Sequence, residues 1–286
     1  MNKRKGLNME QKRNLTGWAF LLPASILIFV FCFYPMVQAL ILSFQKGTGS
    51  AVQPAGFANY ARILKDATFQ QCLFNTIFYF VIQVPIMLIL ALILAQLLNS
   101  PDIKGKGIYR TMIFLPCATS LVSYSMIFKS LFANDGLVNR VLSTVGIPTV
   151  DWFQNAWAAR WVIVIALIWR WTGYNMVFYL AGLQNIDYSI YEAARIDGAN
   201  PVQMFFRIKL PYLLSVQGPS LVTDFVKNVN NFNVIYLLTQ DVFVTNNQQL
   251  AQSNAKEIDL LVTWLFRLTQ EYYNYKMAAV LGIMVF

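Results

Sequence analysis

Six apolar stretches run along the chain, and polar or charged segments separate them. They cover approximately residues 17–44, 75–98, 111–133, 159–183, 212–239 and 275–286. The first five are close to or longer than the ~20 residues that a helix needs to cross about 30 Å of hydrocarbon. The sixth has 12 residues, which at ~1.5 Å per residue cross little more than half of that thickness. The pattern predicts an all-α membrane protein with about six transmembrane helices, the last of which we expect to be incomplete.

Basic residues predict the orientation of these helices. Five of them precede the first apolar stretch: Lys3, Arg4, Lys5, Lys12 and Arg13. Because cytoplasmic segments carry an excess of lysine and arginine, the N-terminus is expected in the cytoplasm. The chain then divides into a cytoplasmic tail over 1–16 and a transmembrane domain over 17–286. The long polar connection 184–211 lies on the cytoplasmic side of that domain.

The composition supports a membrane protein. Of the 286 residues, 57% are hydrophobic and only 12% are charged, whereas a soluble globular protein carries about 25% charged residues. The net charge of +9 could indicate nucleic-acid binding. However, the basic residues are scattered at the ends of apolar stretches, which is typical of membrane topology rather than of one binding face.

Sequence motifs of catalysis are absent. There is no histidine, and Cys32, Cys72 and Cys117 lack the spacing of metal ligands, so we expect no metal and no cofactor. The run Lys104-Gly105-Lys106-Gly107 lacks the first glycine and the hydroxyl residue of a phosphate-binding loop. The chain is therefore not expected to be an enzyme or to hydrolyse ATP itself.

The predicted cytoplasmic connection has a patterned segment. From Tyr191 to Pro211 it reads YEAARIDGANPVQMFFRIKLP. The pattern predicts a short helix over 192–196, a turn at Asp197-Gly198, and a second helix that Asn200 caps and Pro201 begins. Two short helices joined by a glycine turn form a compact knob, which suits docking into a groove on a partner.

This segment resembles the EAA loop of ABC importer permeases. The matching positions are Glu192, Ala193, Ala194, Gly198, Ile208, Leu210 and Pro211. The first and third apolar stretches, LLPASILIFVFCFYPMVQALILSF and TMIFLPCATSLVSYSMIF, are similar to the carbohydrate branch of that family. The run NNFNVIYLLT resembles the larger permease subunit of maltose-type transporters. The resemblance covers nearly the whole chain and implies the type I importer permease fold in the bacterial cytoplasmic (inner) membrane.

The resemblance also implies partners and a coupling site. A permease of this family works with a second homologous permease subunit, two copies of an ATP-binding subunit and an external solute-binding protein that delivers the sugar. Its EAA loop inserts into a cleft on the ATPase, so five residues are expected to form the coupling contact: Glu192, Ala193, Ala194, Asp197 and Gly198. Chemically, Glu192 can pair with a basic residue of the partner and Gly198 allows a tight turn.

Three charged residues fall inside the predicted membrane segments, namely Arg170, Asp224 and Lys227. A charge at the centre of a membrane helix costs roughly 2.5–3.5 kcal/mol, so such residues usually face the interior of a helix bundle. An ion pair between Arg170 and Asp224 is the simplest way to neutralise two of them. A structural role for that pair and a functional one are equally open.

The same two segments predict a substrate path. Asp224, Asn228 and Asn231 are spaced to lie on one helical face, and Trp171 and Tyr174 are one turn apart in the preceding segment. Aromatic rings stack on the apolar faces of sugars while carboxylate and amide groups meet the hydroxyls. The family resemblance implies that these helices line the sugar site. Lys227 has no partner in this scheme, so both a neutral and an acidic sugar remain open.

Two other functions are alternatives. A self-contained secondary transporter of a small polar solute predicts broken helices and ion-coupling carboxylates, and it leaves the patterned loop unexplained. A membrane-embedded enzyme acting on lipid-linked sugars needs paired carboxylates or a metal site, and the sequence offers neither. The sequence therefore favours an ATP-driven importer permease.

Overall fold

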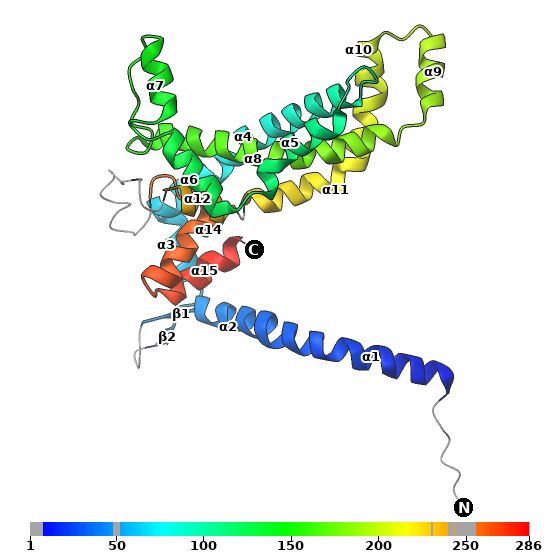
Figure 1. Cartoon of the computed structure of the whole chain (residues 1–286). Helices are drawn as coiled ribbons and strands as arrows, with labels where there is room; N and C mark the ends of the chain where they lie inside the picture. The colour runs from blue at the N-terminus through cyan, green and yellow to red at the C-terminus, as the bar shows by residue number, and fades with distance from the viewer. Residues whose placement is uncertain (1–7, 48–51, 230, 240–242, 244–255, 286) are drawn as a thin grey trace, which may run out of the picture. The chain divides into compact units, whose positions relative to one another are not determined.

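The computed structural model describes residues 8–47, 52–229, 231–239, 243 and 256–285, and almost all of its regular structure is helical (Figure 1). The chain divides into two compact units. The first contains Met1–Lys65 and Leu268–Phe286, and the second contains Asp66–Arg267. The expected all-α class is confirmed, apart from one two-stranded sheet.

The first unit begins with a long apolar helix. It consists of α1 (Met9–Ile28), a π-helical turn η1 (Phe29–Phe33) and α2 (Tyr34–Ser43). A hairpin of β1 (Gln45–Lys46) and β2 (Gln53–Pro54) follows, and then α3 (Ala58–Lys65). The last helix, α15 (Tyr275–Val285), packs against both α2 and α3. A further π-helical turn, η4 (Arg267–Glu271), begins at the last residue of the second unit.

The second unit is built around two long helices that pack along each other, α4 (Ala67–Asn99) and α8 (Ala156–Gln184). The other elements before α8 are α5 (Lys106–Ala118), α6 (Leu121–Leu131) and α7 (Leu137–Thr144). Those after it are α9 (Tyr188–Ile196), α10 (Pro201–Met204), the π-helical turn η3 (Phe205–Lys209), α11 (Leu210–Val229), α12 (Phe232–Thr239) and α14 (Leu261–Phe266).

Three described helices are long and apolar enough to cross a membrane: Lys12–Ser43, Ala67–Asn99 and Ala156–Gln184. They contain the predicted stretches 75–98 and 159–183 and nearly all of 17–44. The predicted stretch 275–286 coincides with the shorter apolar helix α15.

The predicted stretch 111–133 is not one continuous helix. It consists of α5 and α6, which meet at an angle of 95°. Pro116 lies in the last turn of α5, where its ring crowds the preceding turn and its nitrogen cannot donate a hydrogen bond. Thr119 and Ser120 are extended, with ψ of 149° and 136°, so the chain leaves the helix and starts a new one. The predicted stretch 212–239 is likewise divided, into α11 and α12.

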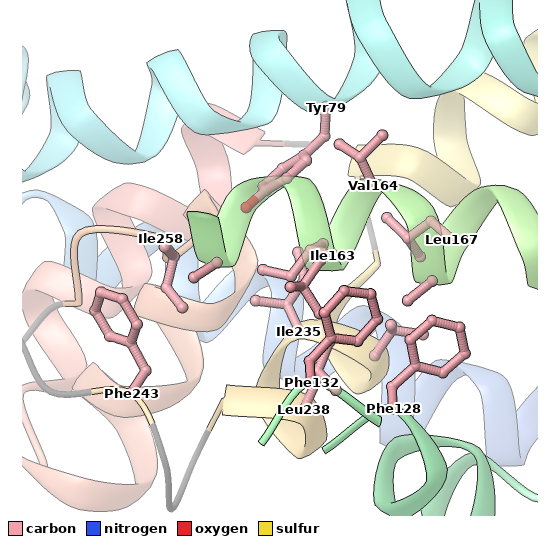
Figure 2. Packing of buried hydrophobic residues seen from close by; sticks show 14 of the residues in the cluster. Tyr79, Phe128, Phe132, Ile163, Val164, Leu167, Ile235, Leu238, Phe243 and Ile258 are labelled. Atoms are coloured by element: carbon pink, nitrogen blue, oxygen red, sulfur yellow. The ribbon is translucent and has the colours of Figure 1, made fainter. Parts of the chain in front are cut away.

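The core of the second unit joins α4, α6, α8 and α12 (Figure 2). Its labelled members are Tyr79, Phe128, Phe132, Ile163, Val164, Leu167, Ile235, Leu238, Phe243 and Ile258. Aromatic rings from α6 and its C-cap stack here, with the centroids of Phe128 and Phe132 6.1 Å apart. Because residues of α8 supply the middle of this cluster, α8 is the helix on which the other elements of the unit are organised.

Candidate functional site

The segment after α8 folds as the sequence predicts. Helix α9 is capped by Asp187, whose carboxylate accepts a hydrogen bond of 3.0 Å from the Ser189 backbone N–H. That hydrogen bond lowers the pKa of Asp187. The helix begins one turn earlier than the predicted 192 and ends at Ile196 as expected.

Gly198 ends α9 in the left-handed conformation, with φ of +78°. Its N–H donates to the Arg195 carbonyl at 3.1 Å, and the Ala199 N–H donates to the Ala194 carbonyl at 2.9 Å. These two bonds form a Schellman motif, which satisfies carbonyls that the end of a helix otherwise leaves open. Only glycine adopts this backbone conformation without a steric penalty, so the glycine of the motif is explained by local geometry.

Helix α10 starts with a capping box. The Asn200 side chain accepts a hydrogen bond of 2.8 Å from the Gln203 N–H, and the Gln203 side chain accepts one of 3.0 Å from the Asn200 N–H. Pro201 occupies the first helical position, where its missing N–H is not needed. The predicted second helix of the segment is thereby confirmed, although it becomes π-helical after Met204.

Four of the five residues predicted for the coupling contact are exposed: Glu192, Ala193, Asp197 and Gly198. The fifth, Ala194, is buried. The carboxylates of Glu192 and Asp197 have no hydrogen bond or ion pair with the described residues. Apolar side chains lie on the same loop, with Ile196 85% and Phe206 60% exposed. A surface that combines free carboxylates with exposed apolar groups suits contact with another protein.

Tyr191 connects this loop to the helices. Its ring packs against a buried cluster formed by α4, α8 and α11, and burial raises the pKa of its hydroxyl. The Lys209 ammonium lies 5.4 Å from the centre of the same ring, and burial together with the nearby Arg195 lowers the pKa of that ammonium. Gly182 of α8 approaches Leu213 so closely that an added Cβ would lie 2.8 Å from its side chain. The loop is therefore anchored where α8 and α11 pack closely.

Arg170 is not paired with Asp224, contrary to the prediction. Its guanidinium donates to the carbonyls of Pro116, Cys117 and Thr119 at 3.3–3.4 Å, and it also lies 5.3 Å from the centre of the Tyr124 ring. These carbonyls belong to the end of α5, where the helix dipole is negative. The break between α5 and α6 exposes them, and a sequence pattern that predicts one continuous helix does not reveal it.

Asp224 instead lies near Lys227 on the next turn of α11, with the ammonium 4.0 Å from Oδ1. The ammonium is also 4.0 Å from the centre of the Tyr174 ring and 5.3 Å from that of Trp171. The two rings are perpendicular, with centroids 5.9 Å apart. Lys227, left without a partner in the sequence prediction, is thus held by one carboxylate and two aromatic faces.

Asp224, Lys227, Trp171 and Asn231 line one small cavity of about 20 Å³, which is room for about one water molecule. Asp224 is 6% exposed, and its Oδ2 has no hydrogen-bond partner among the described residues. Asn231 reaches the cavity from the segment between α11 and α12 rather than from the helical face that was predicted. The side chain of Asn228 lies outside the described residues.

Other polar residues of this region were missed by sequence reasoning. Gln83 of α4 is 2% exposed, lines the same cavity and donates to the Met87 sulfur at 3.3 Å. Asn175 of α8 is also buried and donates to the Trp171 carbonyl at 3.2 Å. An amide residue inside an apolar stretch was the available signal, but the prediction considered only charges, α11 amides and aromatic rings.

A second network was also missed, at the amino-terminal end of α8. Arg160 is 4% exposed and donates to Asn75 Oδ1 at 2.9 Å and to the Glu257 carbonyl at 2.8 Å. Nearby, Arg267 and Asp259 form an ion pair of 3.0 Å. Arg160 lies at the edge of the predicted stretch 159–183, where a basic residue is common, so its burial could not be foreseen.

The chain matches a protein family, individual relatives and a solved structure. Residues 71–286 match the family described as "Binding-protein-dependent transport system inner membrane component". The chain is 43% identical to the lactose transport system permease protein LacF of Rhizobium radiobacter, over 86% of this chain and 83% of that protein. It is 32% identical to the maltose/maltodextrin transport system permease protein MalF of Vibrio vulnificus (strain YJ016), over 78% of this chain but 44% of that protein.

The fold matches a solved structure as well. The chain aligns with a bacterial ABC transporter involved in the import of the acidic polysaccharide alginate, with a TM-score of 0.76 and 22% identity. The alignment covers 96% of this chain and 90% of that one. At this identity the match supports the fold and no conclusion on the substrate. The resemblance to carbohydrate-branch importer permeases, drawn from the sequence, is confirmed by the family and the relatives.

Proposed function

Because the chain belongs to the family of inner membrane components of binding-protein-dependent transport systems, we propose that it is the permease subunit of an ATP-driven importer that translocates a sugar or oligosaccharide. The observation that carries the proposal is the α9–α10 loop beyond the carboxyl-terminal end of α8, where the exposed carboxylates of Glu192 and Asp197 have no partner among the described residues. The relatives named for lactose and maltose support a carbohydrate as the transported substrate.

The loop is proposed to be the contact with a separate ATPase. Glu192 and Asp197 would pair with basic residues of that subunit, Ala193 would allow close approach, and Gly198 fixes the turn. Ala194 would stabilise the loop rather than touch the ATPase, because it is buried and its carbonyl accepts the hydrogen bond that closes the turn. A movement of the loop would pass through Tyr191 into the packed cluster of α4, α8 and α11. This chain of packed contacts is contiguous, so it offers a physical route for the coupling.

The substrate path is proposed to run beside Trp171, Tyr174, Asp224, Asn228 and Asn231. The unpaired Oδ2 of Asp224 can accept a hydrogen bond from a sugar hydroxyl, and the two rings offer apolar faces. The cavity beside them is far smaller than the ~300–1,000 Å³ of a ligand site. We infer that a second homologous permease subunit completes the path and that alternating access opens it.

The membrane arrangement is proposed to comprise six spans with a cytoplasmic N-terminus and a cytoplasmic loop over 184–211. The three long apolar helices and the bent pair of α5 and α6 would form four of the spans. Helices α11 and α15 would form the other two. An external binding protein would deliver the substrate to the face opposite the loop. ATP hydrolysis belongs to the separate subunit, since the sequence lacks a phosphate-binding loop.

The proposal is tested by reconstituting the chain with its ATPase, second permease and binding protein in liposomes. The variant Gly198→Pro disrupts the loop, because proline cannot adopt φ of +78°. Gly146→Pro is the matched control, since Gly146, just after α7, has φ of +79° and likewise donates to a carbonyl three residues earlier. We expect sugar-stimulated ATP hydrolysis to be lost in Gly198→Pro and retained in Gly146→Pro.

Two results would contradict the proposal. Equal loss of stimulation in the two variants, with normal assembly, would mean that the α9 turn has no special role in coupling. Uptake of solute by the purified chain alone, driven by an ion gradient, would establish the secondary transporter instead. A panel of neutral and acidic sugars delivered by the binding protein then identifies the substrate class.

A further inference from the structure

A groove of about 720 Å³ lies in the first unit, where α2 ends and α15 begins. Residues from the end of α2, from β1, from α3 and from the segment that leads into α15 form its walls. It shares no residue with the coupling loop or with the proposed substrate path. The groove is therefore a separate candidate binding site.

The groove is positively charged. Lys46, Arg62 and Lys276 line it, and the described lining residues include no aspartate or glutamate. The Lys276 ammonium donates to the carbonyl of Gly47, which fixes its position. The side chains of Lys46 and Arg62 make no hydrogen bond or ion pair with the described residues. Three cations around one concave surface without a counter-charge favour an anionic ligand, and the planar guanidinium of Arg62 matches a phosphate.

Three tyrosines complete the groove: Tyr272, Tyr273 and Tyr275. They are between 45% and 67% exposed, and the rings of Tyr273 and Tyr275 lie 6.3 Å apart. Tyr273 has φ of +55°, a conformation that costs a residue with a side chain about 1 kcal/mol or more. Tyrosines and basic residues at the ends of membrane helices are typical of the interface between lipid and water.

The position of the groove indicates which anion it meets. Helices α2 and α15 are apolar and pack against each other, so their adjoining ends lie near one surface of the membrane. On α2 the apolar side chains Met36, Leu40 and Ile41 are 46–59% exposed. Leu42 and Met277 continue this apolar surface into the groove. A ligand that fills the groove and its surroundings needs both an anionic group and an apolar chain.

We propose that this groove binds the headgroup of an anionic glycerophospholipid. The phosphate lies among Lys46, Arg62 and Lys276, the tyrosine hydroxyls contact the glycerol region, and the acyl chains lie along the exposed face of α2. A free phosphate ion satisfies only the charges, and an acidic segment of a partner protein satisfies the charges without using the apolar surface. The lipid uses both, so the structure favours it.

The test measures lipid retention by the purified full chain in detergent. The probes are phosphatidylglycerol and phosphatidylcholine, supplied in equal amounts, and native mass spectrometry counts the lipids bound to each chain. We expect a preference for phosphatidylglycerol. Each Lys or Arg near an anionic headgroup contributes about fivefold in affinity, so Lys46→Gln/Arg62→Gln should lower phosphatidylglycerol affinity by about 25-fold. Phosphatidylcholine binding should stay unchanged.

The matched control is Lys65→Gln/Arg140→Gln. It removes two positive charges from exposed positions, and Lys65 belongs to the same helix as Arg62 without lining the groove. We expect less than a twofold change. An equal loss in both double variants would overturn the proposal, because it would show a general effect of net charge. Circular dichroism and gel filtration check that each variant is folded.

Two further measurements distinguish a lipid headgroup from a free anion and from a protein partner. If millimolar inorganic phosphate displaces phosphatidylglycerol completely, the site binds a free anion and the lipid assignment fails. If the native chain shows no lipid preference but the double variant loses affinity for the binding protein in a direct binding assay, the groove is a protein contact and the proposal is wrong. Retention of phosphatidylglycerol against phosphate, lost only in Lys46→Gln/Arg62→Gln, supports it.

Discussion

The two ends of α8 differ in whether the polar groups beside them are buried and paired or exposed and unpaired (Figure 1). At the amino-terminal end, Arg160 is buried and donates to Asn75 and to the Glu257 carbonyl. At the carboxyl-terminal end, the α9–α10 loop exposes Glu192 and Asp197, which have no partner among the described residues. Satisfied buried polar groups resist change, whereas exposed unpaired carboxylates are available for another protein. The amino-terminal end of α8 is therefore held in place by buried polar contacts, and we call it the fixed end. The carboxyl-terminal end leads into a loop that is exposed for contact with another protein, and we call it the presented end.

The largest expected effect is at the fixed end. Replacing Arg160 by methionine leaves the Glu257 carbonyl and Asn75 Oδ1 without their charged donor, which costs about 2–4 kcal/mol of stability. We expect a clear decrease of the thermal unfolding temperature in detergent. Arg195→Met is the control at the presented end, since the Arg195 side chain is exposed and its one hydrogen bond with the described residues is a weak one of 3.4 Å to the Tyr188 hydroxyl. An equal decrease of the unfolding temperature in both variants would contradict the proposed difference between the two ends of α8.

The next effect is expected at the presented end and concerns activity. Glu192→Gln removes the carboxylate that we assign to the ATPase contact, and the loss of one partner of an interfacial charge pair costs roughly 2 kcal/mol or more, about 30-fold. We expect sugar-stimulated ATP hydrolysis in liposomes to decrease by about this factor while the unfolding temperature stays the same.

Asp135→Asn provides the matched control for that measurement. Asp135 is exposed and precedes α7, toward the other end of α8. Its loss should leave ATP hydrolysis unchanged. If Glu192→Gln hydrolyses ATP at the native rate with the sugar-loaded binding protein, Glu192 is not part of the coupling contact.

The smallest effects compare two helix caps of the same residue type. Asn155 caps α8 by accepting from the Trp157 and Ala158 N–H groups at 2.8 and 3.2 Å, and Asn200 caps α10. Replacing either by alanine removes a cap worth about 1 kcal/mol. We expect Asn155→Ala to lower global stability by that amount. Asn200→Ala should act only locally, because an exposed segment opens without global unfolding.

Hydrogen exchange measured by mass spectrometry separates these two outcomes. Asn200→Ala should accelerate exchange of the amides of residues 202–204 and leave α8 protected. If Asn200→Ala instead destabilises the whole unit as much as Asn155→Ala, the loop is not an independent structural element.

The amino-acid sequence by itself determined the local features of this protein. The apolar stretches predict the long helices because they have the length of a membrane-spanning helix, in which every backbone hydrogen bond is made within the segment. Asn200, Pro201 and Gly198 predict the caps and the turn of the loop because each acts within a few residues along the chain. The family resemblance is also visible in the sequence, because it depends on the residue types and spacing of Glu192, Ala193, Ala194, Gly198, Ile208, Leu210 and Pro211.

Only the tertiary structure decided which polar groups meet. Arg170 donates to the carbonyls at the end of α5 because α5 and α6 are separate helices that meet at 95°. Asp224 therefore lies beside Lys227 instead of Arg170. Arg160 meets Asn75 across 85 residues of sequence, and Gln83 joins the cavity of Trp171 and Asn231 from another helix. A buried polar group requires a partner, but its identity depends on how helices pack, which periodicity along one segment does not contain.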